Sequence, residues 1–176
     1  MCPNCEGRTF HFECAFAAYR ARGVVRSLIH RFKYDRQYYL RHVLAGWLTE
    51  AMESPEIAGA PFDAIVPVPL HPVRKRYREF NQAEVLSVLA SKHCGKPVVH
   101  CLRRIRNTET QTHFDRKERM ENLRNAFELR KTCNVQEMRL LLIDDVLTTG
   151  ATLNECSRVL REAGAISVRA ALVARG

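Results

Sequence analysis

The residue types best suited to chemistry lie together in the segment Leu140–Thr152, which reads LLLIDDVLTTGAT. Four apolar residues precede Asp144 and Asp145, and a turn rich in hydroxyl groups follows them, directly before a predicted helix. In open α/β sheets, ligands bind beyond the carboxyl ends of the strands, and the free amides at a helix N-terminus attract anions. Ionised carboxylates only accept hydrogen bonds, so the segment suits a ligand with both hydroxyl and phosphate groups, such as a ribose 5-phosphate unit.

Each part of this segment has a predicted role in binding such a ligand. We expect Asp144 and Asp145 to accept hydrogen bonds from the 2- and 3-hydroxyls of the ribose. Gly150 would let the backbone come close to the phosphate. The rest of the predicted phosphate cradle consists of Val146, Leu147, Thr148, Thr149, Ala151 and Thr152.

Two other kinds of site are less compatible with this segment. Receiver-type domains also place acids at a strand end, where they bind Mg²⁺, but their acid pair lies near the start of the chain. A nucleoside-triphosphate P-loop requires the pattern Gly-x4-Gly-Lys-[Ser/Thr]. This sequence lacks that pattern.

The elements that must hold this segment alternate along the chain between strands and helices. Apolar runs predict strands at 62–67, 98–102, 139–146 and 166–173, and helical apolar spacing predicts helices at 24–34, 38–53, 81–93 and 152–163. This alternation predicts an α/β fold with a mostly parallel sheet flanked by helices. The predicted divisions are a Cys-rich lobe at 1–16, a helical segment at 17–55 and a core at 56–176, with a loop at 54–61.

The acid-containing segment resembles the phosphoribosyl pyrophosphate (PRPP) signature of type I phosphoribosyltransferases at essentially every position. The run VPVPL at 66–70, followed by REFNQ at 78–82, is similar to the ComF group of competence-related proteins. That group generally reads Arg-Gly-Phe-Asn-Gln, so Glu79 departs from it where a glycine would support an unusual backbone angle. The run LIHRFKY at 28–34 and the polar segment at 106–127 also resemble the group.

The resemblance implies a type I phosphoribosyltransferase fold that binds PRPP with Mg²⁺. It implies a pyrophosphate loop after the first core strand, formed by Val68, Pro69, Leu70 and His71 together with Arg74 and Arg76. It also implies a hood at 108–122 that closes over the donor and excludes water. The residues assigned to this hood are Arg106, Thr108, Gln111 and Arg119. A disordered loop without such a role is the competing interpretation of that segment.

Two functions are compatible with this resemblance. The first is enzymatic transfer of a phosphoribosyl group from PRPP to a nitrogenous acceptor, without a covalent nucleophile. The second is the binding of single-stranded DNA in natural transformation, together with other competence proteins. Lys and Arg number 28 against 19 Asp and Glu, and the net charge of +9 fits either phosphate binding or solvated helix faces.

The N-terminal cysteines predict a small metal-binding lobe. Cys2 and Cys5 have the spacing of a turn that brings two thiolates onto one zinc ion, and His11 with Cys14 would complete a structural Cys3His site. Members of the ComF group typically carry two cysteine pairs here, so the alternative is a zinc-ribbon-like lobe whose upstream pair is missing. The other cysteines, predicted to be buried apolar residues, are Cys94, Cys101, Cys133 and Cys156.

The sequence also predicts where the protein resides. It shows no apolar core of a signal peptide at its start and no run of eighteen apolar residues. Its seven cysteines are an odd number, which favours reduced thiols and metal ligands over disulfides. We therefore expect a cytoplasmic protein without membrane insertion.

Overall fold

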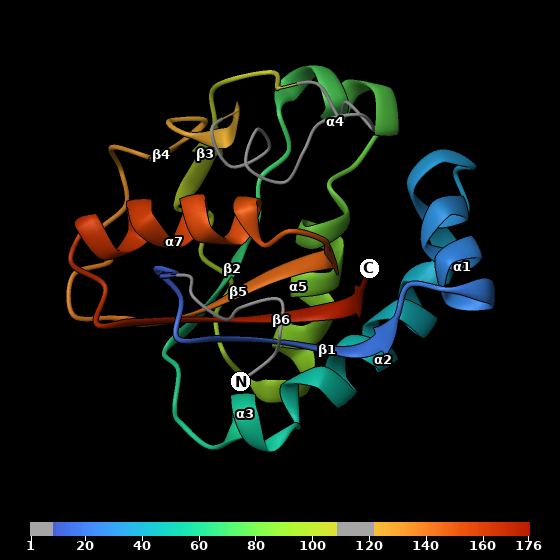
Figure 1. Cartoon of the computed structure of the whole chain (residues 1–176), viewed down its shortest axis with the longest axis horizontal. Helices are drawn as coiled ribbons and strands as arrows, with labels where there is room; N and C mark the ends of the chain where they lie inside the picture. The colour runs from blue at the N-terminus through green and yellow to red at the C-terminus, as the bar shows by residue number, and fades with distance from the viewer. Residues whose placement is uncertain (1–8, 109–121) are drawn as a thin grey trace.

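A computed structural model of the chain describes residues 9–108 and 122–176, and a four-stranded sheet forms its centre (Figure 1). The strands lie in the order β1-β6-β5-β2, and all neighbouring pairs run parallel. Their bounds are Cys14–Arg20 for β1, Ala64–Pro67 for β2, Arg139–Leu147 for β5 and Ser167–Arg175 for β6. The predicted α/β fold with a parallel sheet is confirmed.

The two central strands, β5 and β6, carry most of the buried apolar residues of the sheet. In β5, every residue from Leu140 to Ile143 is at most 1% exposed. Continuous apolar runs of this kind are typical of parallel strands that helices cover on both sides. The strands predicted at 139–146 and 166–173 correspond to β5 and β6.

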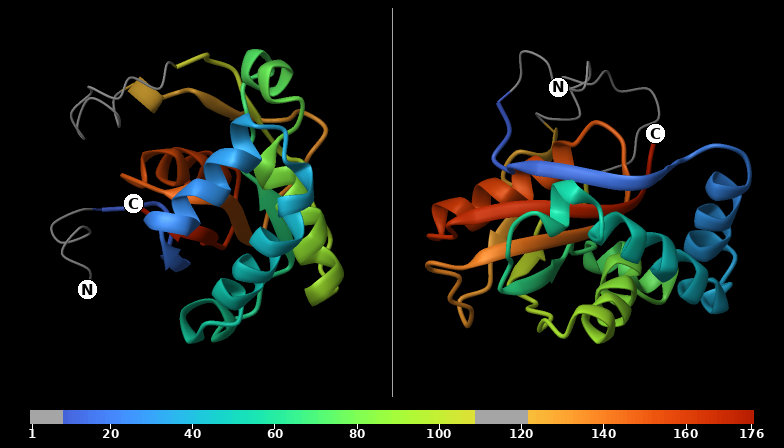
Figure 2. Two further views of the ribbon diagram at one scale, coloured as in Figure 1. Left: turned by 90° about the vertical axis from the view of Figure 1, so that its right-hand side faces the viewer. Right: turned by 90° about the horizontal axis from the view of Figure 1, so that it is seen from below.

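Helices cover both faces of the sheet (Figure 2). On one face, α7 packs over a core that includes Leu140 and Leu142. On the other face, α2 and α5 pack over a core that includes Leu141 and Ile143. The bounds of these helices are Arg41–Met52 for α2, Gln82–Cys94 for α5 and Ala151–Glu162 for α7. The sheet is therefore the middle layer of three, as the alternation of strands and helices predicted.

Shorter elements complete the described structure. The strands β3 and β4 form a separate antiparallel pair. The remaining bounds are Gly23–Tyr34 for α1, Tyr38–Leu40 for the 3-10 helix η1, Pro55–Ala58 for α3, Pro72–Arg78 for α4, Leu102–Arg104 for β3 and Phe127–Leu129 for β4. Within the described ranges, no helix has the length and apolar character needed to cross a membrane.

The strand β1 was not expected from the sequence. It pairs in parallel with β6 from Cys14 opposite Arg169 to Arg20 opposite Arg175. The predicted boundary between the Cys-rich lobe and the helical segment, at residue 16, falls inside this strand. Residues 14–16 therefore belong to the main sheet, because backbone pairing with β6 holds them there.

Two further expectations about local structure need correction. The predicted loop at 54–61 contains the short helix α3, which starts with Pro55 at a position where proline fits a helix well. The predicted strand at 98–102 is reduced to a single bridge between Val98 and Ile65. The end of that segment, Leu102, instead begins β3 of the smaller sheet.

The backbone at Glu79 explains why the ComF group carries glycine there. Glu79 ends α4 in the left-handed conformation, with a φ of 69°. Glycine adopts this conformation without steric cost, whereas another residue loses about 1 kcal/mol. Glu79 also pairs with Arg36 at 2.9 Å, but the two side chains are 53% and 77% exposed, so the pair adds little stability.

We expect Glu79→Gly to raise the free energy of unfolding by about 0.5–1 kcal/mol, because relief of backbone strain exceeds the loss of an exposed ion pair. Glu79→Ala is the matched control, since it removes the same ion pair and keeps the strained backbone. Urea denaturation of the three proteins measures the difference. A Glu79→Gly protein that is less stable than Glu79→Ala contradicts this explanation.

Candidate functional site

Asp144 and Asp145 lie in β5, just beyond the point where β2 ends. The last pair between these strands joins Pro67 to Ile143, whereas β5 continues past the acids to Leu147. The acids therefore stand at an edge of β5 that β2 has left, on the carboxyl side of the parallel sheet. This is the region in which open α/β sheets bind ligands.

The two carboxylates point to opposite faces of the sheet. Side chains alternate along a strand, so Asp144 lies on the α7 side with Leu142, and Asp145 lies on the other side with Ile143. Asp145 is buried and forms an ion pair with Lys33 of α1, with 2.8 Å between Lys33 Nζ and Asp145 Oδ1. Each acid therefore has its own surroundings, a division that the sequence did not predict.

The surroundings of Asp144 favour its protonated form. Burial and the nearby charge of Asp145 raise the pKa of Asp144 to about 7, although Lys33 and Arg104 act in the opposite direction. A carboxyl group with this pKa is partly protonated at neutral pH. Such shifts are common at functional sites, where a ligand or metal ion stabilises the charged form.

The turn after β5 leads directly into α7. Thr148 is exposed, and the Oγ1 atom of Thr149 accepts a hydrogen bond from the Ala151 amide at 3.3 Å. Gly150 has a φ of 79°, which only glycine adopts without strain. Thr152 is half-exposed in the first turn of the helix. The predicted order of strand, turn and helix N-terminus is confirmed, and two residues assigned to the phosphate cradle, Val146 and Leu147, lie in the strand.

The segment before β1 packs against this turn. A Cβ atom placed on Gly150 would lie 3.6 Å from Phe10 and 3.9 Å from Phe12. The two phenylalanine rings stack with their centroids 4.8 Å apart. Between them, the His11 amide donates a hydrogen bond to Asn154 Oδ1 of α7, at 2.8 Å. These contacts anchor the N-terminal segment beside the start of α7.

The zinc site predicted at the N-terminus stays a prediction. Cys2 and Cys5 lie outside the described residues. The Cys14 thiol lies in β1 and donates to the carbonyl of Glu56 at 3.3 Å, and burial raises the pKa of this thiol. A raised pKa disfavours the thiolate that zinc requires. In the described part of the chain, no three His, Cys, Asp or Glu side chains gather in a way suited to a metal ion.

The predicted pyrophosphate loop connects β2 to α4, and its first residue is fixed by two hydrogen bonds. The Val68 amide donates to the carbonyl of Ile143 at 3.0 Å. The Val68 carbonyl accepts from Asn81 Nδ2, also at 3.0 Å. Asn81 in turn caps α5 by accepting from the Ala83 amide. The loop is therefore tied both to β5, close to the acids, and to α5.

The other end of this loop is cationic. His71 caps α4, where its Nδ1 atom accepts from the Val73 amide at 3.4 Å. Burial and the nearby charges of Arg104, Arg74 and Arg76 lower the pKa of His71. His71 is therefore predominantly neutral at neutral pH, and the positive charge of this region resides on the arginines. The remaining loop residues, Pro69 and Leu70, line a groove beside α4.

Arg74 and Arg104 converge on Thr108, a residue predicted to belong to the hood. Arg74 donates to the Thr108 carbonyl at 2.5 Å, and Arg104 donates to the Thr108 hydroxyl. Burial and the charge of Arg78 lower the pKa of Arg74. Burial and the charge of Arg74 lower the pKa of Arg104 to about 10. Two partly buried cations that share a neutral partner form a place where an anion would be stabilised.

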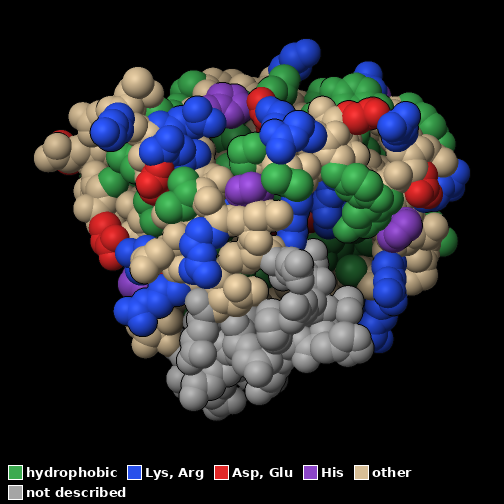
Figure 3. Space-filling view, turned by 90° about the horizontal axis from the view of Figure 1, so that it is seen from above, with side chains coloured by type: hydrophobic (Ala, Val, Ile, Leu, Met, Phe, Trp, Pro, Cys, Tyr) green, Lys and Arg blue, Asp and Glu red, His purple; other side chains and the backbone are tan. Residues whose placement is uncertain are grey.

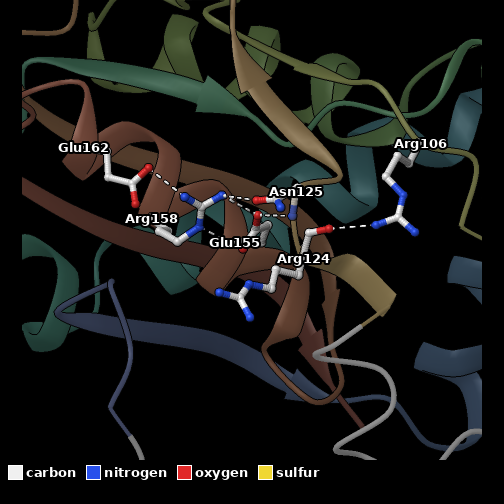
Figure 4. Close-up of polar contacts among 6 residues, drawn as sticks. All are labelled: Arg106, Arg124, Asn125, Glu155, Arg158 and Glu162. Carbon is white, nitrogen blue, oxygen red and sulfur yellow. Dashed lines mark hydrogen bonds and ion pairs between the residues drawn. The ribbon is translucent and has the colours of Figure 1, made fainter.

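A polar network fixes the two ends of the segment that contains the predicted hood (Figure 4). Arg106 donates to the carbonyl of Arg124 at 2.8 Å. The Asn125 amide donates to Glu155 Oε1 of α7 at 2.6 Å, and Arg158 pairs with the same carboxylate, also at 2.6 Å. Burial opposes ionisation of Glu155, but these hydrogen bonds keep its pKa below the usual value. The hood residues Gln111 and Arg119 lie outside the described residues.

A comparison with protein families identifies the family to which this chain belongs. Residues 80–176, more than half of the chain, match the phosphoribosyl transferase domain family. The chain belongs to this family. The matched region contains both aspartates, the turn that follows them and α7.

The sequence is also similar to proteins named for competence and DNA use. It is 38% identical to competence protein F of Haemophilus influenzae, covering 78% of this chain and 62% of that protein. It is 34% identical to DNA utilization protein YhgH of Escherichia coli K12, covering 81% and 63%. It is 28% identical to competence protein ComFC of Streptococcus pneumoniae, covering 96% and 77%. The resemblance to the ComF group is confirmed, and the chain spans less than two thirds of the first two relatives.

Solved phosphoribosyltransferase structures are among those similar to this chain. Adenine phosphoribosyltransferase from Thermoanaerobacter pseudethanolicus is 15% identical with a TM-score of 0.47, covering 83% of this chain and 72% of that one. Glutamine PRPP amidotransferase from B. subtilis is 21% identical with a TM-score of 0.47, covering 74% and 25%. The assignment of the fold rests on the parallel sheet and the family match.

Sequence reasoning missed two charged residues near the acids. Lys33 belongs to a cationic stretch of α1 that the sequence also allowed to be a solvated helix face, and Arg104 belongs to a similar cluster. Lys33 could have been found from the resemblance of the run LIHRFKY to the ComF group. Arg104 could have been found from the basic cluster RRIR at 103–106. Only the fold shows that Lys33 pairs with Asp145 and that the charge of Arg104 lowers the pKa of Asp144.

Proposed function

We propose that this protein binds PRPP together with Mg²⁺ and transfers its phosphoribosyl group to a nitrogenous acceptor. In this reaction the bond between ribose C1 and the diphosphate oxygen breaks, a bond from the acceptor nitrogen to C1 forms, and the nitrogen loses a proton. The observation that carries the proposal is the adjacent acid pair between an open strand edge and the N-terminus of α7, within a phosphoribosyl transferase domain.

The proposed ligand lies along the edge of β5 that β2 has left. At this edge, side chains of both faces of the strand reach a bound sugar, so Asp144 and Asp145 accept hydrogen bonds from its hydroxyls. Lys33 engages Asp145 Oδ1, and Oδ2 is the atom proposed to accept from the ribose. The 5-phosphate binds at the turn, where Thr148 and the amides before α7 serve as donors.

The proposed reaction depends on stabilisation of the charge that develops in the transition state, and it needs no covalent intermediate with the protein. Loss of diphosphate leaves a ribosyl group with oxocarbenium character, and the protein contributes by positioning and by fixed charges. Mg²⁺ neutralises charge on the diphosphate, and it is commonly bound by one or two carboxylates together with substrate phosphates. Asp144 fits that requirement, because it lies at the site and Lys33 pairs with its neighbour instead.

The test is the double substitution Asp144→Asn with Asp145→Asn. It should weaken PRPP binding in the presence of Mg²⁺ by at least about 100-fold, because two hydrogen bonds to charged groups are lost. Isothermal titration calorimetry measures the affinity, and circular dichroism confirms that the fold is intact. Glu53→Gln, which neutralises an exposed acid after α2, is the control. Equal affinity of the double variant and the unchanged protein would exclude this donor site.

A second candidate function is the binding of single-stranded DNA. It is supported by similarity to proteins named for competence and DNA utilization. It is also supported by the many Lys and Arg side chains on the face that Figure 3 shows. Tyr77 of α4, between Arg76 and Arg78 in the sequence, is 78% exposed and could stack on a base. Both functions require phosphate recognition, so they can share this surface.

A further inference from the structure

The turn after β5 is contacted by a segment from the other end of the sequence. We call Phe10, His11 and Phe12 the N-terminal clasp. Its two phenylalanine rings stack and approach the turn, where a Cβ atom on Gly150 would lie 3.6 Å from Phe10 and 3.9 Å from Phe12. The clasp lies outside residues 80–176, the part of the chain that matches the phosphoribosyl transferase domain family. The family match therefore does not account for this contact.

Asn154 of α7 connects the clasp to the turn. Its side-chain Oδ1 atom accepts a hydrogen bond from the His11 amide at 2.8 Å. Its own amide donates to the carbonyl of Gly150, also at 2.8 Å. The same residue thus bonds to the turn through its backbone and to the clasp through its side chain. A displacement of the clasp would therefore be transmitted to Gly150.

The residue type at position 154 fits this connection better than it fits a helix. Asparagine is less favourable inside a helix than alanine or leucine, because its side chain competes for backbone hydrogen bonds. In this structure the Asn154 side chain instead accepts from an amide outside the helix. That amide belongs to His11, which precedes β1. The side chain therefore satisfies a backbone donor of an irregular segment.

The clasp and the turn are both anchored to the sheet. The Glu13 amide, directly after the clasp, donates to the carbonyl of Val168 in β6 at 2.8 Å. Phe12 packs against the core that α7 covers. Where the turn begins, the carbonyl of Leu147 accepts from the Gly176 amide at 2.8 Å. The turn is therefore supported at its start by the end of β6 and at Gly150 by the clasp.

We propose that the N-terminal clasp holds the turn in the conformation that binds the 5-phosphate, with Asn154 as the positioning residue. The role of the turn in phosphate binding rests on the proposed function. Amides and hydroxyls stabilise an anion best when the protein holds them in place before the ligand arrives. Glycine restricts its own backbone less than any other residue, so a turn that contains Gly150 needs support from outside. The clasp supplies this support.

The test measures PRPP binding with Mg²⁺ by isothermal titration calorimetry. Asn154→Ala and Phe10→Ala should each weaken binding about tenfold, because a less ordered turn holds the phosphate with fewer donors. Phe10→Leu is the conservative variant, which keeps an apolar side chain against Gly150 and should retain most of the affinity. Asn154→Ala combined with Phe10→Ala should weaken binding by less than the product of the two single effects, because both act through the same turn.

Asn134→Ala is the matched control. The Asn134 side chain also accepts a hydrogen bond from a backbone amide, that of Gln136 at 2.9 Å, but it lies in the loop before β5. This variant should bind PRPP as the unchanged protein does, and thermal melting checks that each variant is folded. Equal losses of affinity in Asn134→Ala and Asn154→Ala would mean that the clasp acts only through stability, which overturns the inference.

The outcomes separate this inference from the proposed function. The inference is overturned if Asn154→Ala and Phe10→Ala bind PRPP as strongly as the unchanged protein, even where Asp144→Asn/Asp145→Asn weakens binding and the donor site stands. It is supported if the clasp variants bind more weakly, even where the double acid variant binds normally. If the unchanged protein does not bind PRPP, both the proposed function and the inference are overturned.

Discussion

Replacing Lys33 by methionine is expected to destabilise the folded protein by about 3 kcal/mol at pH 7. The side chains of Lys33 and Asp145 are only 17% and 8% exposed, and their charged atoms lie 2.8 Å apart. Removing one partner of such a pair leaves the other charge buried without compensation, which costs about 3–5 kcal/mol. Methionine keeps most of the apolar length of lysine, so the change isolates the charge. Urea denaturation at pH 7 measures the loss.

The matched control for this result adds Asp145→Asn to Lys33→Met. If the uncompensated carboxylate causes the loss, the double variant should recover most of the stability, and the two changes should be strongly non-additive. An exposed ion pair contributes at most about 1 kcal/mol. A loss of stability below that value, or additive effects of the two substitutions, contradicts the inference that Lys33 compensates the buried charge of Asp145.

The central layer of the fold could be predicted because its signals are local. The apolar run before Asp144 is long enough to specify a buried strand, and the periodic apolar residues of α7 specify a helix that starts one residue before the predicted Thr152. The turn between them requires glycine at Gly150 for a local reason, its positive φ. Elements that are specified by the pattern of a few neighbouring residues can be predicted from a single sequence.

The elements that were missed depend on distant partners. The strand β1 contains three alanines and mostly half-buried side chains, so neither β propensity nor an apolar alternation marks it, and pairing with β6 at the other end of the chain holds it. The strands β3 and β4 are three residues each and pair across a long sequence separation. The ion pair of Lys33 with Asp145 is equally non-local. Hydrophobic pattern carries no information on such contacts.

The location of the two acids in the fold was therefore predicted better than their chemical environment. The sequence showed two adjacent carboxylates and the turn that follows them. The predicted strand at 139–146 already contained both acids, but the sequence did not show the different surroundings that alternation along this strand gives Asp144 and Asp145. One acid becomes paired with a cation, and the other becomes a carboxyl group with a raised pKa. The second of these has the larger consequence for how the protein responds to pH.

Asp144→Asn is expected to stabilise the protein at pH 8 while weakening the binding of PRPP. In the folded protein, burial and Asp145 raise the pKa of Asp144 from 3.8 to about 7. The unfolded chain loses this proton near pH 4, so between pH 4 and 7 the folded state binds more protons than the unfolded state. Its stability therefore falls as pH rises through this range. Asparagine carries no charge, so the variant avoids this loss.

Urea denaturation of both proteins from pH 4 to pH 8 measures the effect. The two stabilities should be similar at pH 4 and should diverge as pH rises, with the variant more stable above pH 7. Asp63→Asn is a contrasting control, because hydrogen bonds from Arg139 lower the pKa of Asp63 to about 2, and its removal should destabilise the protein throughout this range. Parallel pH profiles of the Asp144→Asn and unchanged proteins contradict a raised pKa. Diverging pH profiles would show that the Asp144 carboxylate destabilises the protein at neutral pH. Such a carboxylate is expected where a bound ligand or Mg²⁺ supplies the compensating interactions.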